Sequence, residues 1–551
     1  MSHKIWVVFL LFIHLLLLVF SIQHKTLTYD EPYHYQYGYN VFHFNTSRLN
    51  NETMPFFSDS KMPISCLNVI PGQRRNLFTP LPANRAAYIA HIRKNVLLGR
   101  YVTMLFSFVL GWYIYRWSDR LYGKFAADAS LFLYAFSPNI IAHARLVTTD
   151  MYAICSITVA FYYFWNFMNT PDRKNAFFSA IALGIAQLTK YTALFLYPLF
   201  LILWLLNAST REFGFIKAKN YHALFEDWWK AGKTLFLFLI INLLIINTGF
   251  LWNGSFRLFR DYHFNSERFQ ALQQELTIIR NLPVPLPAPF VQGIDWIFYH
   301  DKTGVSFGNI YLLGKIQRTN TPEFVGFKGY YWIASLFKFP LATQIIIMIS
   351  LISYLVKRKK YAFRRNELYL LLPVCAYSLY FNLLHRTQIG IRHYLVILPF
   401  LYVFVGSFLK DWRTFTGKTR TLLSLLAVYL VLSVLSYYPH YLSYFNELVW
   451  DRKKAYKILA DSNIDWDQNK EYLARYLKKH PEVIVNPPGP TTGKILVRVN
   501  DLVGVSTGPE QYRWLREHYE PTAHVAYSYL IFDLSQAPSP ASRGDKGSPS
   551  Q

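Results

Sequence analysis

The amino-acid sequence predicts a mainly α-helical, polytopic membrane protein with a small α/β domain at its C-terminal end. Of its 551 residues, 52% are hydrophobic and only 16% are charged, whereas a soluble globular protein is nearer a quarter charged. The apolar residues occur in blocks of roughly 16–20, the length that a helix needs to cross about 30 Å of hydrocarbon. Repeated blocks of this length indicate many membrane spans.

About eleven transmembrane helices are expected from these blocks. They cover approximately 5–22, 96–115, 125–142, 151–168, 176–189, 190–207, 234–251, 340–356, 368–384, 394–409 and 421–437. The stretch 176–207 fits either one long helix or two short ones around Leu188-Thr-Lys190. The first block follows Lys4 and precedes no small-x-small cleavage site, so we expect an uncleaved anchor.

The net charge of +25 is unevenly distributed along the chain. Lys and Arg cluster in alternate short loops, at 116–124, 173–174, 357–365 and 410–420. This is the positive-inside pattern, so these loops and the N-terminus are expected in the cytoplasm and the C-terminal domain outside. The protein is therefore predicted to be a multi-pass protein of the cell inner (plasma) membrane, and nucleic-acid binding is excluded as the reason for the charge.

The expected extracytoplasmic parts are two outer loops, at about 23–95 and 252–339, and a tail. The tail is long enough for a small domain at 438–536, after the transmembrane domain at 1–437. Alternating residues at 495–499 and 524–532 predict strands, and 471–479 predicts a helix. Residues 537–551 are rich in Pro, Ser and Gly, which predicts a disordered end.

The sequence predicts neither a disulfide framework nor a metal site. Two of the three cysteines, Cys155 and Cys375, fall inside predicted spans. The segment Asp461-Ser-Asn-Ile-Asp-Trp-Asp467 resembles a calcium loop, but Trp466 and Tyr472 stand where that loop needs Gly and Glu. No cofactor is indicated with certainty, and a looser divalent-cation site remains open.

The adjacent carboxylates Asp30 and Glu31 follow the first span closely. A charge near the bilayer must be solvated, paired or functional. Tyrosines and His34 surround the pair, an aromatic setting suited to a sugar ring or a lipid head group. We expect partial desolvation to raise the carboxylate pKa, so that it can act as a general base; the alternative is a solvated pair at the start of a loop.

A second polar motif, Ser137 to Met151, links two apolar blocks on the same outer face. It carries His143, Arg145 and Asp150. An Arg–Asp ion pair between two helix ends is one interpretation. The other is a second acidic group with a cation placed for a phosphate.

Together these motifs resemble the family of polyprenyl-phosphate-sugar-dependent glycosyltransferases, which includes the protein O-mannosyltransferases and the lipid A aminoarabinose transferase. The matching features are the acidic dipeptide after the first span and the outward-facing His-Ala-Arg-Leu-Val-Thr-Thr-Asp-Met. Further matches are Arg100, Leu188-Thr-Lys-Tyr, Gly390-Ile-Arg-His-Tyr, His440-Tyr-Leu-Ser-Tyr-Phe-Asn-Glu and Ala460-Asp-Ser-Asn-Ile-Asp-Trp-Asp. The last two are similar to a bacterial branch of the family, and the resemblance covers about 5–535.

The resemblance implies a GT-C type membrane enzyme that uses a lipid-phosphate sugar outside the cytoplasm. It implies that Asp30 is the base for the acceptor hydroxyl, that Asp150 is the second acidic residue and that Arg100 contacts the donor phosphate. Glu31 is expected to support the site. The loop at 252–339 is too short for the β-trefoil repeats of eukaryotic protein mannosyltransferases, so the acceptor stays open among protein Ser/Thr, lipid and envelope glycan.

Other cations are candidates for the donor phosphate, because Arg presents a planar fork that matches phosphate oxygens. They are Arg145, Arg257, Arg260, Arg386, Arg392 and His393. Head-group contact at the interface is the alternative role for each arginine.

The predicted reaction is the inverting transfer of a sugar from a polyprenyl-phosphate donor to a hydroxyl of an extracytoplasmic acceptor. Positioning and electrostatics would supply most of the catalysis, since the phosphate is already a good leaving group. Two other functions are compatible with the pattern. One is a transporter or flippase of lipid-linked sugars, which should carry charges inside several spans; the other is a non-catalytic scaffold for envelope assembly.

Overall fold

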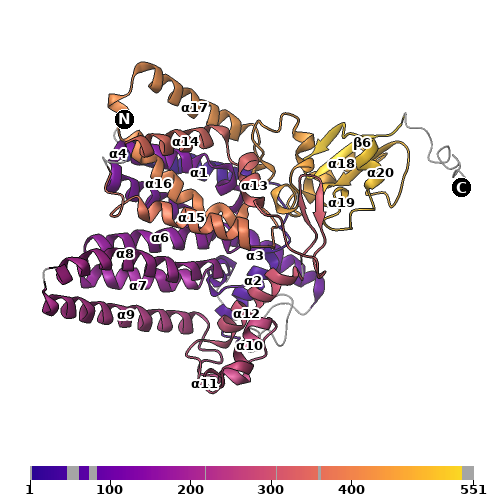
Figure 1. Ribbon diagram of the computed structural model, residues 1–551. Coiled ribbons are helices and arrows are strands. Elements are labelled where there is room, and N and C mark those ends of the chain that lie inside the picture. Colours follow the sequence, from indigo (N-terminus) through magenta and orange to yellow (C-terminus); the bar gives the residue numbers. More distant parts are fainter. Residues whose placement is uncertain are drawn as a thin grey trace, which may run out of the picture.

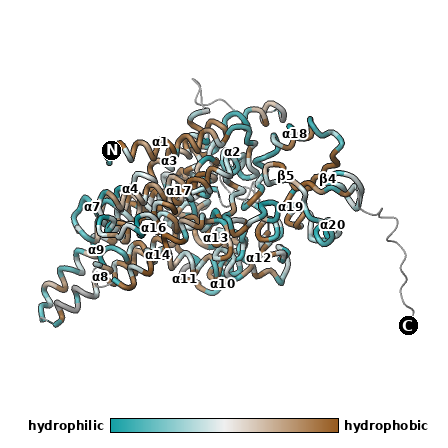
Figure 2. The backbone as a smooth tube through the Cα atoms, turned by 90° about the horizontal axis from the view of Figure 1, so that it is seen from above, coloured by the Kyte–Doolittle hydropathy of each residue, from teal (hydrophilic) through white to brown (hydrophobic). Residues whose placement is uncertain are grey.

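The computed structural model describes residues 3–45, 61–72, 84–217, 219–305, 307–357 and 361–535. Long helices lie side by side and form the membrane part, and a small sheet domain lies at one end of them (Figure 1). The hydrophobic residues run along these helices (Figure 2). The predicted fold class, a polytopic helical membrane protein with a small α/β domain, is confirmed.

The helices of the membrane part and its outer loops are bounded as follows. They are α1 (His3–Ser21), α2 (Glu31–Phe42), α3 (Arg85–Tyr122), α4 (Lys124–Ala135), α5 (Pro138–His143), α6 (Asp150–Asn169), α7 (Arg173–Gln187), α8 (Leu196–Lys217), α9 (Tyr221–Gly249), α10 (Glu267–Glu275), α11 (Thr277–Arg280), α12 (Ala288–Thr303), α13 (Tyr330–Lys338), α14 (Leu341–Val356), α15 (Leu368–Leu379), α16 (Leu398–Leu409) and α17 (Gly417–Leu435). Short helical turns join several of them, including η2 (Pro63–Asn68), η4 (Tyr191–Phe195), η7 (Tyr380–Leu384), η8 (Ile391–Ile397) and η12 (Asp461–Asn463).

Each predicted apolar block lies on helical structure, but not every block is one long helix. Within the described residues, seven helices are long and apolar enough to cross a membrane, or eight if the bent pair α13 and α14 counts as one span. The block 125–142 is divided into α4 and α5, and the block 368–384 ends in a π-helical turn. The ambiguous stretch 176–207 forms two helices, α7 and α8, because the chain leaves the helical conformation at Lys190.

Helix α16 is at the centre of the membrane part and α9 is at its edge. Within the apolar window of each span, 89% of residues 391–409 are buried, against 17% for α9. The centre is tight: a Cβ atom on Gly406 would lie 2.7 Å from Ser118 Oγ and 2.8 Å from Tyr122, so glycine allows α16 to approach α3 closely. Exposed leucines on α9 suit contact with lipid.

The two long loops that the sequence predicts, 23–95 and 252–339, contain more helices and strands than the sequence indicates. Helix α2 lies within the predicted loop 23–95, and α3 begins at Arg85, well before the predicted span. The loop at 252–339 holds α10 to α13 and a hairpin of β1 (Ile310–Leu312) and β2 (Lys315–Gln317). The last helix of this loop, α13, is bent by 114° from α14 at a break that contains Pro340.

The C-terminal domain is a four-stranded sheet of order β3-β4-β6-β5 with three short helices. Its elements are α18 (Lys470–Lys479), β3 (Ile484–Val485), β4 (Lys494–Arg498), α19 (Val499–Leu502), α20 (Arg513–His518), β5 (Ala523–Val525) and β6 (Tyr529–Asp533). The predicted helix and first strand are confirmed as α18 and β4. The second predicted strand, 524–532, is instead a hairpin, because Ala526 and Tyr527 turn the chain with φ of 52° and 63°. The predicted disordered end, 537–551, lies outside the described residues.

The chain before this sheet pairs with the chain after α1. Thr26 N donates to Gln468 O at 3.0 Å, and Tyr29 N donates to Trp466 O at 3.2 Å. Since Tyr29 directly precedes Asp30, this pairing holds residues 460–470 beside the acidic dipeptide. The C-terminal part of the chain is thus next to the first predicted site residues.

Candidate functional site

Asp30 lies at the start of α2, where Pro32 occupies the first turn. Proline suits this position because the first amides of a helix have no partner within the helix. The Asp30 side chain accepts no capping bond from α2. It turns instead towards Arg392 of η8, whose Nη1 donates to Asp30 Oδ2 at 2.9 Å.

Arg392 joins the two predicted acidic residues into one cluster. Its Nη1 lies 3.8 Å from Asp150 Oδ2, and Lys190 Nζ lies 2.5 Å from Asp150 Oδ1. The side chains of Asp30 and Lys190 are each 21% exposed, whereas Asp150 is 2% exposed. Four charges from four distant segments therefore form a row near the starts of α2 and α6, with Asp30 and Lys190 partly exposed; we call it the Asp30–Lys190 cluster.

Residues of the C-terminal part hold Arg392 in place. The Arg392 guanidinium lies 4.1 Å from the centre of the Trp466 ring. Ile391 N donates to Asn463 Oδ1 at 3.0 Å. A Cβ atom at Gly390, whose φ is 148°, would lie 2.2 Å from Ser462 Oγ, so glycine is needed where these two segments meet.

The expectation of a raised pKa for the dipeptide's base is wrong for Asp30. Burial raises the pKa of the Asp30 carboxyl, but the positive charges of Arg392 and Lys61 outweigh burial, and the pKa lies below its ordinary value. Asp30 is therefore a carboxylate at neutral pH, able to accept a proton. A neighbouring cation, which the sequence pattern does not place beside Asp30, is the physical reason.

Three further titratable groups, His34, Lys61 and Asp461, lie beside the cluster. His34 is buried, and its Nδ1 has no hydrogen-bond partner among the described residues. Burial and the Lys61 charge keep the pKa of His34 well below its ordinary value. Burial raises the pKa of Asp461 to about 7, although Arg392 acts in the opposite direction. The cluster thus combines charged groups with His34, which is neutral near pH 7, and with Asp461, which is about half protonated there.

Glu31 has a different environment from Asp30. Arg100 Nε and Nη2 donate to its two carboxylate oxygens at 2.8 and 2.6 Å. Val147 N and Thr28 N donate to the Glu31 carboxylate at 3.0 and 2.8 Å, and Thr28 Oγ1 donates to it at 3.2 Å. Both side chains of this pair are fully buried, so the predicted phosphate contact, Arg100, is bonded to the predicted supporting carboxylate.

The remaining predicted phosphate ligands are divided among three places. His393 adjoins Arg392, and its Nδ1 lies 3.5 Å from Tyr331 Oη. Arg145 turns towards the end of α1, where it donates to Ser21 O. Arg257 lies over the Tyr262 ring, and Arg260 donates to Asn281. Of these residues, His393 lies within electrostatic range of Asp150.

An apolar groove of about 450 Å³ lies between the C-terminal ends of α2 and α9 and the turn η2. Its lining is almost entirely hydrophobic: Val41, Phe42, Phe44, Pro63, Ile64, Cys66, Leu67, Leu188, Thr248, Gly249 and Leu251. Leu188 and Pro63 are each two residues from a cation of the site, Lys190 and Lys61, and Ile64 N donates to Leu188 O at 3.2 Å. Two segments of the groove lining are therefore continuous in the chain with the cations Lys61 and Lys190.

Residues 79–225 match the model of the dolichyl-phosphate-mannose-protein mannosyltransferase family. The matched segment includes Arg100, Asp150 and Lys190, whereas Asp30 and Arg392 lie outside it. The predicted resemblance to polyprenyl-phosphate-sugar-dependent glycosyltransferases is thereby confirmed. No curated protein sequence matches the chain.

Two solved structures have a similar arrangement of helices. ArnT from Cupriavidus metallidurans, bound to undecaprenyl phosphate, is 12% identical with a TM-score of 0.47, over 96% of this chain and 98% of that one. The archaeal oligosaccharyltransferase AglB from Archaeoglobus fulgidus, in complex with an inhibitory peptide and a dolichol-phosphate, is 12% identical with a TM-score of 0.47, over 86% of this chain and 59% of that one.

Sequence reasoning missed Lys61, Lys190, Trp466 and Asp461 as site residues. Lys190 had a signal, because it is a lone cation between two apolar blocks, where a charge needs a partner. The segment 461–467 also carried a signal, because it combines carboxylates with Trp466. Its spacing resembles a calcium loop, and that resemblance does not indicate contact with Arg392. Lys61 had no signal in its spacing. Within the described ranges, no group of three or more His, Cys, Asp or Glu side chains is arranged to hold a metal ion.

Proposed function

We propose that this protein is an inverting glycosyltransferase that moves a sugar from a polyprenyl-phosphate donor to a hydroxyl of an extracytoplasmic acceptor. The observation that carries the proposal is the Asp30–Lys190 cluster. It places a partly exposed carboxylate beside cations, and an apolar groove is lined by residues two positions from Lys61 and Lys190 in the chain. The family match over 79–225 supports a prenyl-phosphate sugar as the donor class.

The groove and the cations fit the two ends of such a donor. A volume of about 450 Å³ with an apolar lining suits part of a prenyl chain. Lys61 and Lys190 lie where the phosphate would emerge from the groove, and His393 and Arg392 adjoin them.

The reaction follows from these positions. Asp30 accepts the proton of the acceptor hydroxyl while the hydroxyl oxygen forms a bond to the anomeric carbon. The bond between that carbon and the phosphate oxygen breaks, and the electron pair leaves with the polyprenyl phosphate. Cations placed at the leaving oxygen stabilise the developing charge. Attack opposite the leaving group inverts the anomeric centre.

The positive-inside pattern supports an extracytoplasmic site and an inner-membrane location. The C-terminal domain, paired with the segment before Asp30, would face the acceptor side. Reporter fusions after Lys174 and after Leu534 test this: the first should report the cytoplasm and the second the outside. The same side for both would contradict the proposed topology.

Purified protein, a radiolabelled polyprenyl-phosphate sugar and an envelope extract test the activity. Wild type should release polyprenyl phosphate and label an acceptor, and Asp30→Asn should lose nearly all of this. Glu275→Gln, which removes an exposed carboxylate of α10, is the matched control and should behave as wild type.

The same assay separates the other functions. A transporter of lipid-linked sugars would move the donor across a vesicle membrane and leave its sugar–phosphate bond intact. A scaffold would do neither. Uncleaved donor with wild type, in the presence of acceptor extract, would overturn the enzyme proposal.

A further inference from the structure

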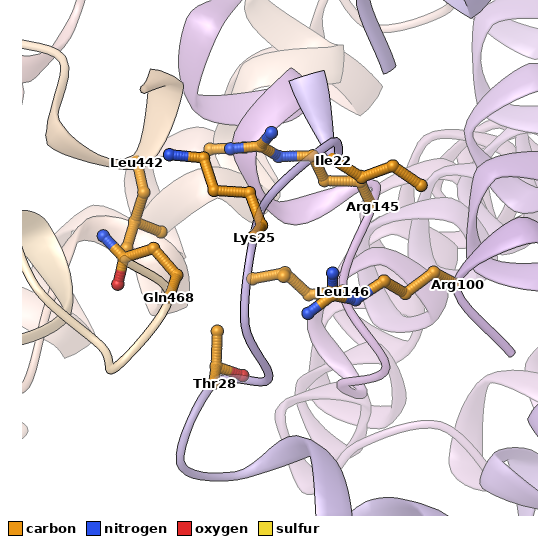
Figure 3. A pocket seen from close by; sticks show the side chains of 9 residues that line it. Ile22, Lys25, Thr28, Arg100, Arg145, Leu146, Leu442 and Gln468 are labelled. Atoms are coloured by element: carbon orange, nitrogen blue, oxygen red, sulfur yellow. The ribbon is translucent and has the colours of Figure 1, made fainter. Parts of the chain in front are cut away.

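A small cavity is lined by residues of the segment before Glu31, Lys25 and Thr28, and by Arg100, which bonds Glu31. Its volume is about 10 Å³, the space that one water molecule or one small ion requires. Three cations from three segments, Lys25, Arg100 and Arg145, point into the same space (Figure 3). We call it the three-cation cavity.

Hydrogen-bond donors in the three-cation cavity exceed the acceptors. Arg100 Nη1 and Arg145 Nε are buried and have no hydrogen-bond partner among the described residues. Arg100 is 0% exposed and Arg145 is 3% exposed. An unbonded buried charged donor costs more than a typical hydrogen bond stabilises, so these N–H groups favour an acceptor in the cavity.

The buried charge is also unbalanced. Glu31 neutralises Arg100. Within the described part of the chain, neither Lys25 nor Arg145 makes an ion pair; Lys25 donates to Asn469 Oδ1 at 2.6 Å, and its Nζ lies 2.7 Å from His440 Nδ1. Arg145 has only the carbonyls of Ser21 and Pro439 and the Tyr441 ring. Two buried cations without a carboxylate leave a strongly positive space.

The positive charge of the cavity also affects the pKa values of Lys25 and His440. Burial, together with the charges of Arg145 and Arg100, lowers the pKa of Lys25 well below its ordinary value. Burial and the charges of Lys25 and Arg145 lower the pKa of His440 to about 2. A negative ion in the cavity would act in the opposite direction on both.

We propose that the three-cation cavity binds one small inorganic anion, with chloride the physiological occupant. The ion would accept from Arg100 Nη1, Arg145 Nε and Lys25 Nζ. A cavity of about 10 Å³ is too small for a phosphate group, so Arg100 and Arg145 serve this site and not the donor phosphate.

The position of the ion gives it a structural role. Lys25 belongs to the segment after α1, Arg100 to α3, Arg145 to the connection before α6, and Gln468 to the C-terminal part. All four segments meet around the chain that carries Asp30. The anion therefore ties the C-terminal part to the membrane part beside the site.

Thermal unfolding of the full-length protein in detergent tests the proposal. At a fixed ionic strength of about 0.15 M, replacing gluconate by chloride should raise the Tm saturably by about 1–3 °C. Lys25→Met and Arg145→Met should abolish the dependence on chloride, whatever their absolute Tm. Lys478→Met, an exposed position on α18, should keep it.

A second measurement needs no variant. Chloride NMR of the wild-type protein should show line broadening that bromide competes away and gluconate does not. Equal Tm values in chloride and gluconate, without excess broadening, would mean that the cavity holds water only and would overturn the proposal. A chloride effect of equal size in Lys25→Met, Arg145→Met and Lys478→Met would overturn it as well.

Discussion

Asp30 and Glu31 are neighbours in the chain, yet they belong to two regions of opposite character. Around Asp30 the carboxylate has one cation at 2.9 Å and is 21% exposed. Around Glu31 the carboxylate has two bonds from Arg100 and two from backbone amides, and it is 0% exposed. The first region is open to a ligand and the second is closed by its own bonds.

Two adjacent carboxylates can therefore have different roles: one can take part in proton transfer, and the other can stabilise the fold. A carboxylate whose acceptors are all used can hold three chain segments together but cannot take up a proton without breaking that network. A carboxylate with spare acceptor sites and access can. We therefore expect substitutions around Asp30 to reduce activity and substitutions around Glu31 to reduce stability.

The largest effect should come from Asp30→Asn. If Asp30 is the base, turnover should fall by about 100- to 10,000-fold, and the Tm should change little because the side chain is partly exposed. Donor cleavage and thermal unfolding of the same sample measure both. An active Asp30→Asn protein would remove the distinction between the two carboxylates.

Arg100→Met should act mainly on stability. Breaking one side of a buried ion pair costs about 3–5 kcal/mol, because the other charge stays buried without a partner. Arg93→Met, on the exposed surface of the same helix, is the matched control and should cost less than about 0.5 kcal/mol. An Arg100→Met protein with the wild-type Tm would show that the buried Arg100–Glu31 pair does not stabilise the fold.

Lys190→Met should weaken the donor site. Hydrogen bonds to charged groups contribute about 1.5–3 kcal/mol, so kcat/KM for the donor should fall about 10- to 100-fold. Lys174→Met, an exposed lysine at the start of α7, should leave it unchanged. A loss confined to the Tm, with kcat/KM intact, would instead make Lys190 a structural partner of Asp150.

Trp466→Leu tests the contact that holds Arg392. A desolvated cation–π contact contributes up to about 2 kcal/mol, so kcat/KM should fall about 3- to 30-fold. Trp450, which is 93% exposed, supplies the control Trp450→Leu. Equal activities for the two variants would show that Arg392 needs no aromatic support.

The smallest effect is a pH dependence from Asp461. Burial raises the pKa of this carboxyl to about 7, so the folded state keeps a proton that the unfolded state loses above about pH 4. Stability should therefore fall as pH rises from about 4 to about 7 and then level off. Asp461→Asn, which resembles the protonated side chain, should flatten this part of the Tm profile; an unchanged profile would contradict the raised pKa.

The helical membrane part was predictable because the bilayer imposes a length and a composition on each span. Every apolar block therefore lies on a helix, even where the helix is broken, as at Ser137 or Lys190. The strand at 524–532 was mispredicted because the positive φ angles of Ala526 and Tyr527 leave no mark in an alternating pattern. The sequence indicated four site residues, Asp30, Asp150, Arg392 and His393. Polar groups beside apolar blocks must be solvated, paired or functional.

The sequence by itself determined the fold class and the outer-face candidates, because hydrophobicity and charge act on the chain locally. Only the tertiary structure decided which of these residues contact one another and which site each belongs to. It joined Asp30 to Arg392 across 362 positions, bonded Arg100 to Glu31, and turned Arg145 away to the three-cation cavity. Such pairings depend on which buried charges can be neutralised at the same time, and that is a property of the packed molecule.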